Sequence, residues 1–152
     1  MVDVEYFDGF QRTIQRRSSA EDGQVIVDGW RGYNRRGWEA ERTSPFFSTG
    51  FAYVAGEGSS GVQRYRFTYD ALGRIVQTIT PDDRPARLLY GPGTITRYDV
   101  SDTDDSPENI ARGHFDTPRQ EEYDARGKLL TITEQNVGAA VTTRFTLDPR
   151  GL

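Results

Sequence analysis

The stretch Tyr123-Asp124-Ala125-Arg126-Gly127-Lys128-Leu129 decides the fold, because it specifies a tight β-hairpin turn residue by residue. An aspartate at the first position of a type I turn hydrogen-bonds the backbone two residues further on. A glycine at the fourth position takes the left-handed conformation that closes a three-residue hairpin loop with a bulge. We therefore expect the tip of a hairpin here.

The same pattern of an aromatic or apolar residue, Asx, two residues and glycine occurs four times. The turn positions are Asn34, Gly37, Asp70, Gly73, Asp124, Gly127, Asp148 and Gly151. Pro149 suits the second position of the last turn, where its fixed φ fits a type I geometry. An imperfect earlier copy begins at Asp8, but Gln11 stands where glycine is expected. We expect that first turn to be strained or of another type.

Alternation of apolar and polar residues predicts strands between these turns. In Arg64 to Tyr69 the aromatic side chains share one face, and Val141 to Leu147 alternates in the same way. Further expected strands are 2–7, 12–17, 24–31, 75–80, 87–90, 94–98 and 128–134. The prediction is an all-β fold, an antiparallel array of β-hairpins. Repeat spacing is irregular, so we expect a single segment over 1–152 with inserted loops at about 55–62 and 101–119.

Composition excludes several classes of function. The formal net charge of −4 argues against sequence-independent nucleic-acid binding, which needs a basic surface. Zero cysteines exclude thiol catalysis, disulfides and Cys-type zinc sites. No run approaches the roughly 18 apolar residues of a membrane span. We expect no metal, no cofactor and no membrane insertion by this segment.

The C-terminal end of the chain suggests a piece of a longer polypeptide. The start, Met1-Val2-Asp3-Val4-Glu5, lacks the basic and apolar regions of a signal peptide. The end, Asp148-Pro149-Arg150-Gly151-Leu152, opens a turn and stops before a return strand. We expect the chain to be a fragment of a larger protein.

Three motifs have a chemical interpretation and a simpler one. The G-x-G-x-x-G pattern at 56–61 needs a following helix to bind a dinucleotide, and an alternating strand follows instead. The acidic residues between Asp99 and Glu108 fail the spacing of a calcium-binding EF-hand. His114, the single histidine, precedes Asp116 but has no nucleophile or second histidine in support. A flexible loop, a solvated acidic loop and a structural histidine are favoured.

Exposed aromatic residues leave a binding function open. Trp30 and Trp38 could stack on sugars, as in the carbohydrate-binding β-modules of bacterial surface or secreted proteins. Aromatic residues on strands are more often part of the core. Sugar binding is therefore the alternative to a structural role.

The turn motif, as it stands in Tyr69-Asp70-Ala71-Leu72-Gly73-Arg74-Ile75, resembles the YD repeat of the Rhs family. Tyr6 to Gln15 is similar to a Y-x-D-G-x-G-R-x-x-Q segment of the B component of insecticidal toxin complexes and of related plasmid virulence B proteins. Gly29-Trp30, Ser44 to Gly50 and His114 to Pro118 also resemble that family, in the family's order. Gln11, Asn34 and Lys128 depart from its pattern.

The resemblance implies a structural protein without catalytic activity. In that family, YD-repeat hairpins wind into a β-strip that curls into a hollow shell around a toxin domain. This chain would be one segment of the wall, and its partners would be the remainder of the same shell polypeptide or other toxin-complex components. It would be secreted or lie at the cell surface as part of a bacterial toxin.

The resemblance also suggests a less favoured enzymatic alternative. The sequence Asp148-Pro149-Arg150-Gly151-Leu152 looks like the motif at the end of Rhs cores, where an aspartate helps self-cleavage after the leucine. Asp148 would need a second carboxylate to share or shuttle the proton, and the sequence offers no evident partner. An interrupted YD repeat explains the same residues by turn chemistry alone.

Overall fold

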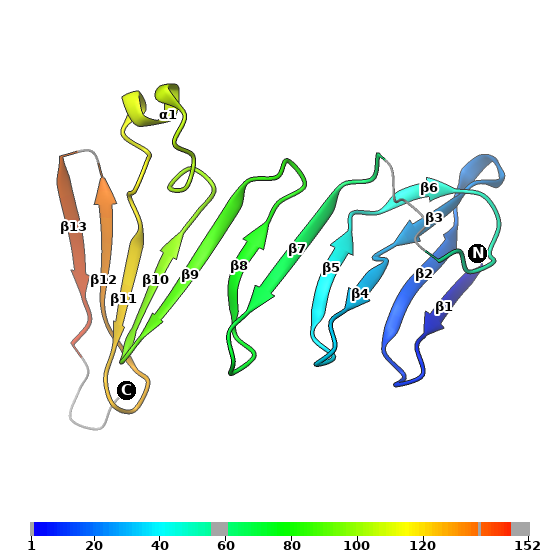
Figure 1. Cartoon of the computed structure of the whole chain (residues 1–152), viewed down its shortest axis with the longest axis horizontal. Coiled ribbons are helices and arrows are strands. Elements are labelled where there is room, and N and C mark those ends of the chain that lie inside the picture. The colour runs from blue at the N-terminus through cyan, green and yellow to red at the C-terminus, as the bar shows by residue number, and fades with distance from the viewer. Residues whose placement is uncertain (1, 56–60, 137, 147–152) are drawn as a thin grey trace. The chain divides into compact units, whose positions relative to one another are not determined.

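The computed structural model describes residues 2–55, 61–136 and 138–146, and these residues are almost entirely β-strand (Figure 1). The elements in chain order are β1 (Asp3–Phe7), β2 (Thr13–Ser19), the short 3-10 helix Glu21–Gly23, β3 (Val25–Asp28), β4 (Arg31–Tyr33), β5 (Glu39–Thr43), β6 (Phe46–Ser48), β7 (Arg64–Tyr69), β8 (Ile75–Ile79), β9 (Pro85–Gly91), β10 (Thr94–Tyr98), α1 (Pro107–Arg112), β11 (Arg119–Tyr123), β12 (Leu129–Asn136) and β13 (Ala139–Arg144). The strand pairs β1–β2, β2–β3, β3–β6, β4–β5, β5–β7 and β9 through β13 are all antiparallel. The expected all-β fold of antiparallel hairpins is confirmed.

The chain forms two compact units. The first comprises Met1–Gly73 and Ile79–Asp82, and the second comprises Arg74–Thr78 and Asp83–Leu152.

In the first unit, one sheet has the strand order β1-β2-β3-β6, and β7, β5 and β4 pair in that order in a second sheet. The tips joining β1 to β2 and β4 to β5 lie at the same side of the unit (Figure 1). The ladders slip by one residue beside each tip, between Tyr6 and Phe7 and between Gly32 and Tyr33. This slip is the bulge that a three-residue hairpin loop closing on a left-handed residue produces.

The most buried face of the first unit mixes apolar and polar side chains. Val25 and Val27 on β3 are buried, and Gln15 and Arg17 on β2 are fully buried beside them. The guanidinium of Arg17 donates to Gln15 Oε1 at 3.0 Å and to the Gly50 carbonyl at 2.8 Å. Sequence alternation alone gives Gln15 and Arg17 the pattern of a solvated face, so their burial was missed.

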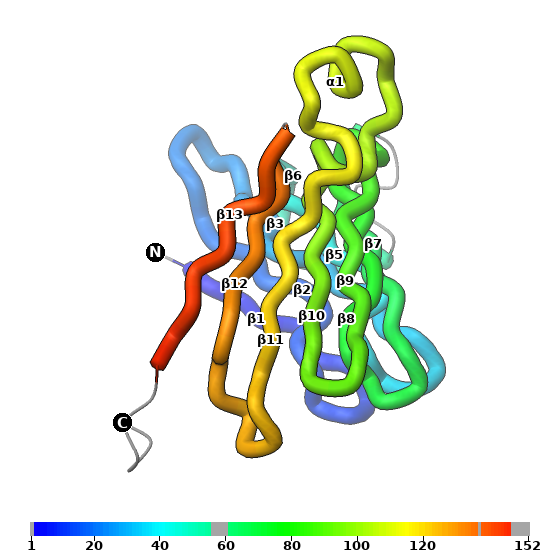
Figure 2. Tube along the Cα trace, turned by 90° about the vertical axis from the view of Figure 1, so that its left-hand side faces the viewer, coloured from blue at the N-terminus to red at the C-terminus, as the bar shows by residue number. Residues whose placement is uncertain are grey.

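In the second unit, the strands lie in the order β13-β12-β11-β10-β9-β8. Figure 2 shows β10 to β13 side by side, with β13 at the edge. Every residue of β13 is exposed, because it pairs only with β12 among the described residues. The insert between β10 and β11 carries α1 and projects beyond the ends of these strands (Figures 1 and 2).

Helix α1 has recognisable start and stop signals. The Ser106 hydroxyl caps the Asn109 amide, Pro107 occupies the first turn, and Gly113 ends the helix with a φ of 72°. The sequence prediction contained no helix here. It also placed one strand over 24–31, whereas the structure divides this region into β3 and β4, because Gly29 takes a left-handed φ of 61° between them.

Candidate functional site

The hairpin turns share one hydrogen-bond pattern, which is clearest at Asn34. The Gly37 amide donates to the Asn34 carbonyl at 2.9 Å, which closes the turn. The Asn34 side-chain oxygen then accepts from the amides of Arg36 at 2.9 Å and of Trp38 at 3.1 Å. One Asx side chain therefore satisfies two backbone donors that would otherwise point into water.

Asp8, Asp70 and Asp124 occupy the same position in their turns. Asp8 Oδ1 accepts from the amides two and four residues on at 2.8 and 3.0 Å, and Asp124 Oδ1 does so at 2.8 and 2.9 Å. Asp70 Oδ1 accepts from the Leu72 amide at 2.9 Å. The carbonyls of all three accept from the fourth turn residue at 2.9 to 3.2 Å. Asn34 is neutral and accepts the same two hydrogen bonds, so the turn depends on the side-chain acceptor oxygen and not on a negative charge.

The fourth turn position is left-handed in every described copy. Gly37, Gly73 and Gly127 have φ values of 80°, 83° and 77°, and Gln11 has a φ of 62°. The first turn is therefore of the same type as the others, with a glutamine in a conformation that costs an L-residue about 1–2 kcal/mol. An ion pair of 2.5 Å between Arg12 and Asp8 lies beside this turn.

Hydrogen bonding in the turns shifts the pKa of their carboxyl groups. The Arg12 side chain holds the pKa of Asp8 below its usual value, against a smaller opposing effect of desolvation. The backbone amide of Lys128 does the same for the pKa of Asp124. Both turns therefore hold a carboxylate in its charged form.

Tyrosines that precede the turns connect neighbouring hairpins of the first unit. The Tyr33 hydroxyl donates to the Thr13 carbonyl at 3.0 Å, and the Tyr69 hydroxyl donates to the Glu39 carbonyl at 2.7 Å. Each acceptor lies five residues after the Asx of the previous turn. Burial, and then the nearby Glu39 carboxylate, raises the pKa of Tyr69. We call this repeated contact the tyrosine ladder.

A second repeated contact covers the same rings. The residue directly after the left-handed position lies against the ring of a tyrosine further along the chain. The Arg12 guanidinium is 4.1 Å from the centre of the Tyr33 ring, and the Trp38 and Tyr69 rings are 5.2 Å apart. In the second unit, the Arg74 guanidinium is 4.1 Å from the centre of the Tyr90 ring. The sequence signal is a cation or aromatic residue four positions after Asx, and the sequence prediction did not use it.

In the second unit, the tyrosine before the turn bonds within its own strand. Tyr123 donates to Glu121 Oε2 at 2.7 Å, and Arg97 and Arg119 lie 3.3 and 3.2 Å from the Glu121 carboxylate. Burial raises the pKa of Glu121, but the hydrogen bonds from Tyr123 and Arg97 outweigh it and the net shift is downward. This buried carboxylate keeps its charge because three donors surround it.

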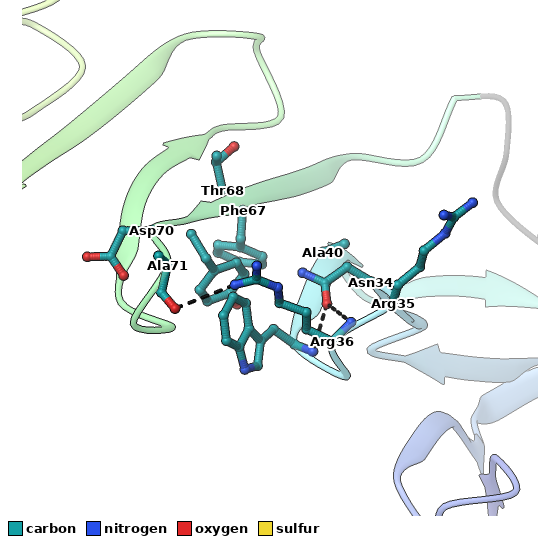
Figure 3. Close-up of a pocket in the computed structure, with 10 residues that line it drawn as sticks. Asn34, Arg35, Arg36, Ala40, Phe67, Thr68, Asp70 and Ala71 are labelled. Atoms are coloured by element: carbon teal, nitrogen blue, oxygen red, sulfur yellow. Dashed lines mark hydrogen bonds between the residues drawn. The ribbon is translucent and has the colours of Figure 1, made fainter.

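A groove of about 580 Å³ lies beside the turn between β4 and β5 (Figure 3). Trp38, Phe67 and Tyr69 supply its apolar lining. The Arg36 guanidinium is 5.2 Å from the centre of the Trp38 ring and donates to the Ala71 carbonyl at 3.5 Å. The groove therefore combines an aromatic floor with a net cationic rim, because two arginines, Arg35 and Arg36, line it together with one carboxylate, that of Asp70.

The two candidate sugar-stacking residues have different surroundings. Trp38 belongs to the groove, packed on Tyr69 and beneath Arg36. Trp30 is also half-buried, with the Arg64 guanidinium 5.6 Å from its ring centre. Both rings have an arginine over them, so any sugar would compete with that contact.

The insert after β10 gathers the remaining polar candidates. A cavity of about 580 Å³ is lined by Asp99, Asp102 and His114 among others. The Asp102 carboxylate accepts from the Thr117 hydroxyl and the Asp99 amide, both at 2.7 Å, and so ties the two ends of the insert together. His114 is exposed and lines the same cavity, and its carbonyl accepts from the Thr117 hydroxyl at 3.0 Å.

Two sequence candidates fall outside the described residues. These are the terminal turn with Asp148 and Gly151, and most of the G-x-G-x-x-G pattern at 56–61. Over the part of the chain that is described, no cluster of three or more His, Asp or Glu side chains could hold a metal ion. Within the same part, no helix is long and apolar enough to cross a membrane.

Comparison with solved structures defines the fold class. The chain superimposes on the crystal structure of TcdB2-TccC3 with a TM-score of 0.82 at 22% sequence identity, over 98% of this chain and 8% of that chain. The structure of the Tc holotoxin pore of Photorhabdus luminescens matches with a TM-score of 0.82 at 22% identity, over 99% of this chain and 8% of that chain.

The chain therefore has the fold of a segment of these toxin-complex chains and spans about 8% of their length. No family model matches the sequence, and no curated protein matches it. The likeness is thus one of fold, carried by the hairpins and their turns.

Proposed function

We propose that this chain is a non-catalytic wall segment of a shell of the Rhs or toxin-complex B type, which encloses a toxin domain. The observation that carries the proposal is the tyrosine ladder, within a fold that follows toxin-complex chains over 98% of its length. A wall must join each hairpin to the next. Tyr33 and Tyr69 do this by bonding the backbone of the preceding hairpin, so the joint survives changes in the side chains around it.

On this proposal the partners are the remainder of the same shell polypeptide or other toxin-complex components. The wall would act outside the producing bacterium, as part of a secreted or surface-held toxin. We also propose that the turns are YD repeats, on the basis of their sequences; the solved structures share only the fold with this chain.

Limited proteolysis of the complete polypeptide that contains the chain tests the proposal. A closed shell protects an enclosed domain from protease, so a large protected fragment is expected. Replacing Gly73 by Val would open the wall, because a side chain there meets Trp38, and protection should be lost. Arg126→Ala, at an exposed turn tip, is the matched control and should keep protection. Absence of any protected domain would contradict the shell.

Two measurements separate the alternatives. Binding to a glycan array that disappears in Trp30→Ala or Trp38→Ala would favour a carbohydrate-binding module. Cleavage after Leu152 in a longer polypeptide, lost in Asp148→Asn, would show self-processing. The wall proposal expects neither.

A further inference from the structure

Two of the most exposed large apolar side chains in the described residues occupy the same position of the turn motif. Phe10 is 81% exposed and Leu72 is 77% exposed, and each is the third of its four turn residues. A tip that only water touches is normally polar. Exposed apolar groups that recur at one position indicate a surface that another macromolecule covers.

The turn between the turns of Phe10 and Leu72 in the sequence carries positive charge. Arg35 and Arg36 form the tip between β4 and β5, and Arg36 is exposed. Arg35 and Arg36 both line the groove, and the Arg36 guanidinium lies over the Trp38 ring, whereas Figure 3 shows the Arg35 side chain directed away from Phe67 and Ala71. We call Phe10, Arg35, Arg36, Leu72 and the adjoining groove the turn edge. Its occupant must offer apolar side chains and carboxylates.

The insert between β10 and β11 has the complementary composition. Residues 101–118 hold five carboxylates and one guanidinium, a formal charge of −4 that equals the net charge of the whole chain. Ile110 is 52% exposed and Phe115 is 41% exposed. The Asp105 and Glu108 carboxylates lie at the surface of the same insert. An acidic segment with two apolar side chains fits an apolar groove with a cationic rim.

We propose that the turn edge of one copy of the chain binds the acidic insert of a second copy. This goes beyond the proposed function, because it concerns association between copies. The two surfaces differ, so the contact is heterologous and every copy carries one of each. Such a contact continues from copy to copy unless the rotation closes a ring.

Sedimentation velocity of the whole chain tests the proposal. At about 100 µM the average mass should exceed that of a monomer. It should fall when NaCl is raised from ~50 mM to ~500 mM, because salt screens the charge attraction. In Arg35→Glu/Arg36→Glu, and separately in Asp105→Lys/Glu108→Lys, association should weaken roughly tenfold or more. Arg126→Glu reverses the same charge at the same turn position of the second unit, and it should leave association unchanged.

Combining the variants reveals the direction of the contact. A one-to-one mixture of the neutralised variants Arg35→Gln/Arg36→Gln and Asp105→Asn/Glu108→Gln should stop at dimers, because the native turn edge belongs to one variant, the native insert belongs to the other, and the two neutral surfaces do not attract each other. One chain carrying all four reversals should associate again. A monomer at low salt and high concentration would overturn the proposal. So would association that neither pair of reversals weakens, which would assign it to open strand edges such as β13.

Discussion

The Tyr69 hydroxyl donates a 2.7 Å hydrogen bond to the carbonyl oxygen of Glu39, thirty residues away in sequence and on the preceding hairpin. Tyr33 makes the corresponding bond to Thr13 at 3.0 Å. The bond therefore repeats with the turn and not with a fixed number of residues. It explains how hairpins at unequal spacings along the chain keep one geometry at their tips.

The ladder predicts a cost for removing one hydroxyl. Tyr69→Phe leaves the Glu39 carbonyl without this partner while the ring still packs on Trp38. We expect the free energy of unfolding to fall by about 1 kcal/mol. Urea denaturation measures it. Tyr65→Phe, in the same strand, is the matched control, because the Tyr65 hydroxyl takes no part in the ladder, and it should change stability much less.

The left-handed conformation of Gln11 in the first turn predicts that Gln11→Gly raises the free energy of unfolding. Gln11 has a φ of 62°, and Gln11→Gly removes the strain of a side chain there. Removing the strain stabilises the fold by about 1–2 kcal/mol, whereas the greater freedom of glycine in the unfolded chain destabilises the fold by roughly 0.5–1 kcal/mol. A net gain of about 0.5–1 kcal/mol is expected in thermal or urea unfolding.

The reciprocal variant is the control for that gain. Gly127 has a φ of 77°, and a Cβ at this position would have open space around it, so Gly127→Gln adds strain without a clash. It should lower the free energy of unfolding. Equal stability of both variants and the native chain would show that the turn conformation carries no strain.

A third prediction concerns the contact between turn and groove. A Cβ at Gly73 would lie 2.9 Å from the Trp38 ring, whereas a Cβ at Gly127 meets nothing within 4 Å. The φ values are close, so the strain of alanine is similar at both sites. Gly73→Ala should therefore be more destabilising than Gly127→Ala, by about 1–3 kcal/mol for the overpacking. Similar losses would mean that Trp38 moves aside freely.

The fourth prediction is a dependence on pH. Backbone amides lower the pKa of Asp124 in the fold below the value of 3.8, and the Arg12 side chain does so for the pKa of Asp8. The unfolded chain then binds protons more readily than the folded chain. Both groups therefore contribute stability that is present above pH 3.8 and is lost as pH falls through the folded pKa.

Asp8→Asn/Asp124→Asn checks this dependence, because asparagine keeps the acceptor oxygen and takes up no proton, as Asn34 shows. The melting temperature of this variant should decrease less steeply below pH 3.8 than that of the native chain. Identical slopes for the variant and the native chain would contradict the role of the turn carboxylates.

The turns could be predicted from sequence because their chemistry is local. Asx and glycine three residues apart determine the backbone of the tip, as at Asn34 and Gly37, whatever surrounds it. Most of the strands followed from alternation for the same reason, but β5, β6 and β11 were not predicted. Gln11 was the exception, since it takes a left-handed conformation that an L-residue with a side chain disfavours.

What could not be predicted depends on contacts between distant residues. Gln15 and Arg17 have the sequence pattern of a solvated face, but the segment that follows β6 reaches Arg17 through the Gly50 carbonyl. The groove over Trp38 likewise forms from two hairpins. Alternation in the sequence indicates which residues of a strand share a face, but it does not indicate which polar face is covered by another segment of the chain.

Electron cryo-microscopy of the complete polypeptide that contains this chain tests the central claim most directly. We expect a closed hollow shell in which β1 to β13 form consecutive hairpins of the wall, with the Tyr33 and Tyr69 ladder intact and density for a domain inside. A chain folded as a separate body, with no cavity behind its strands, would contradict the proposed wall.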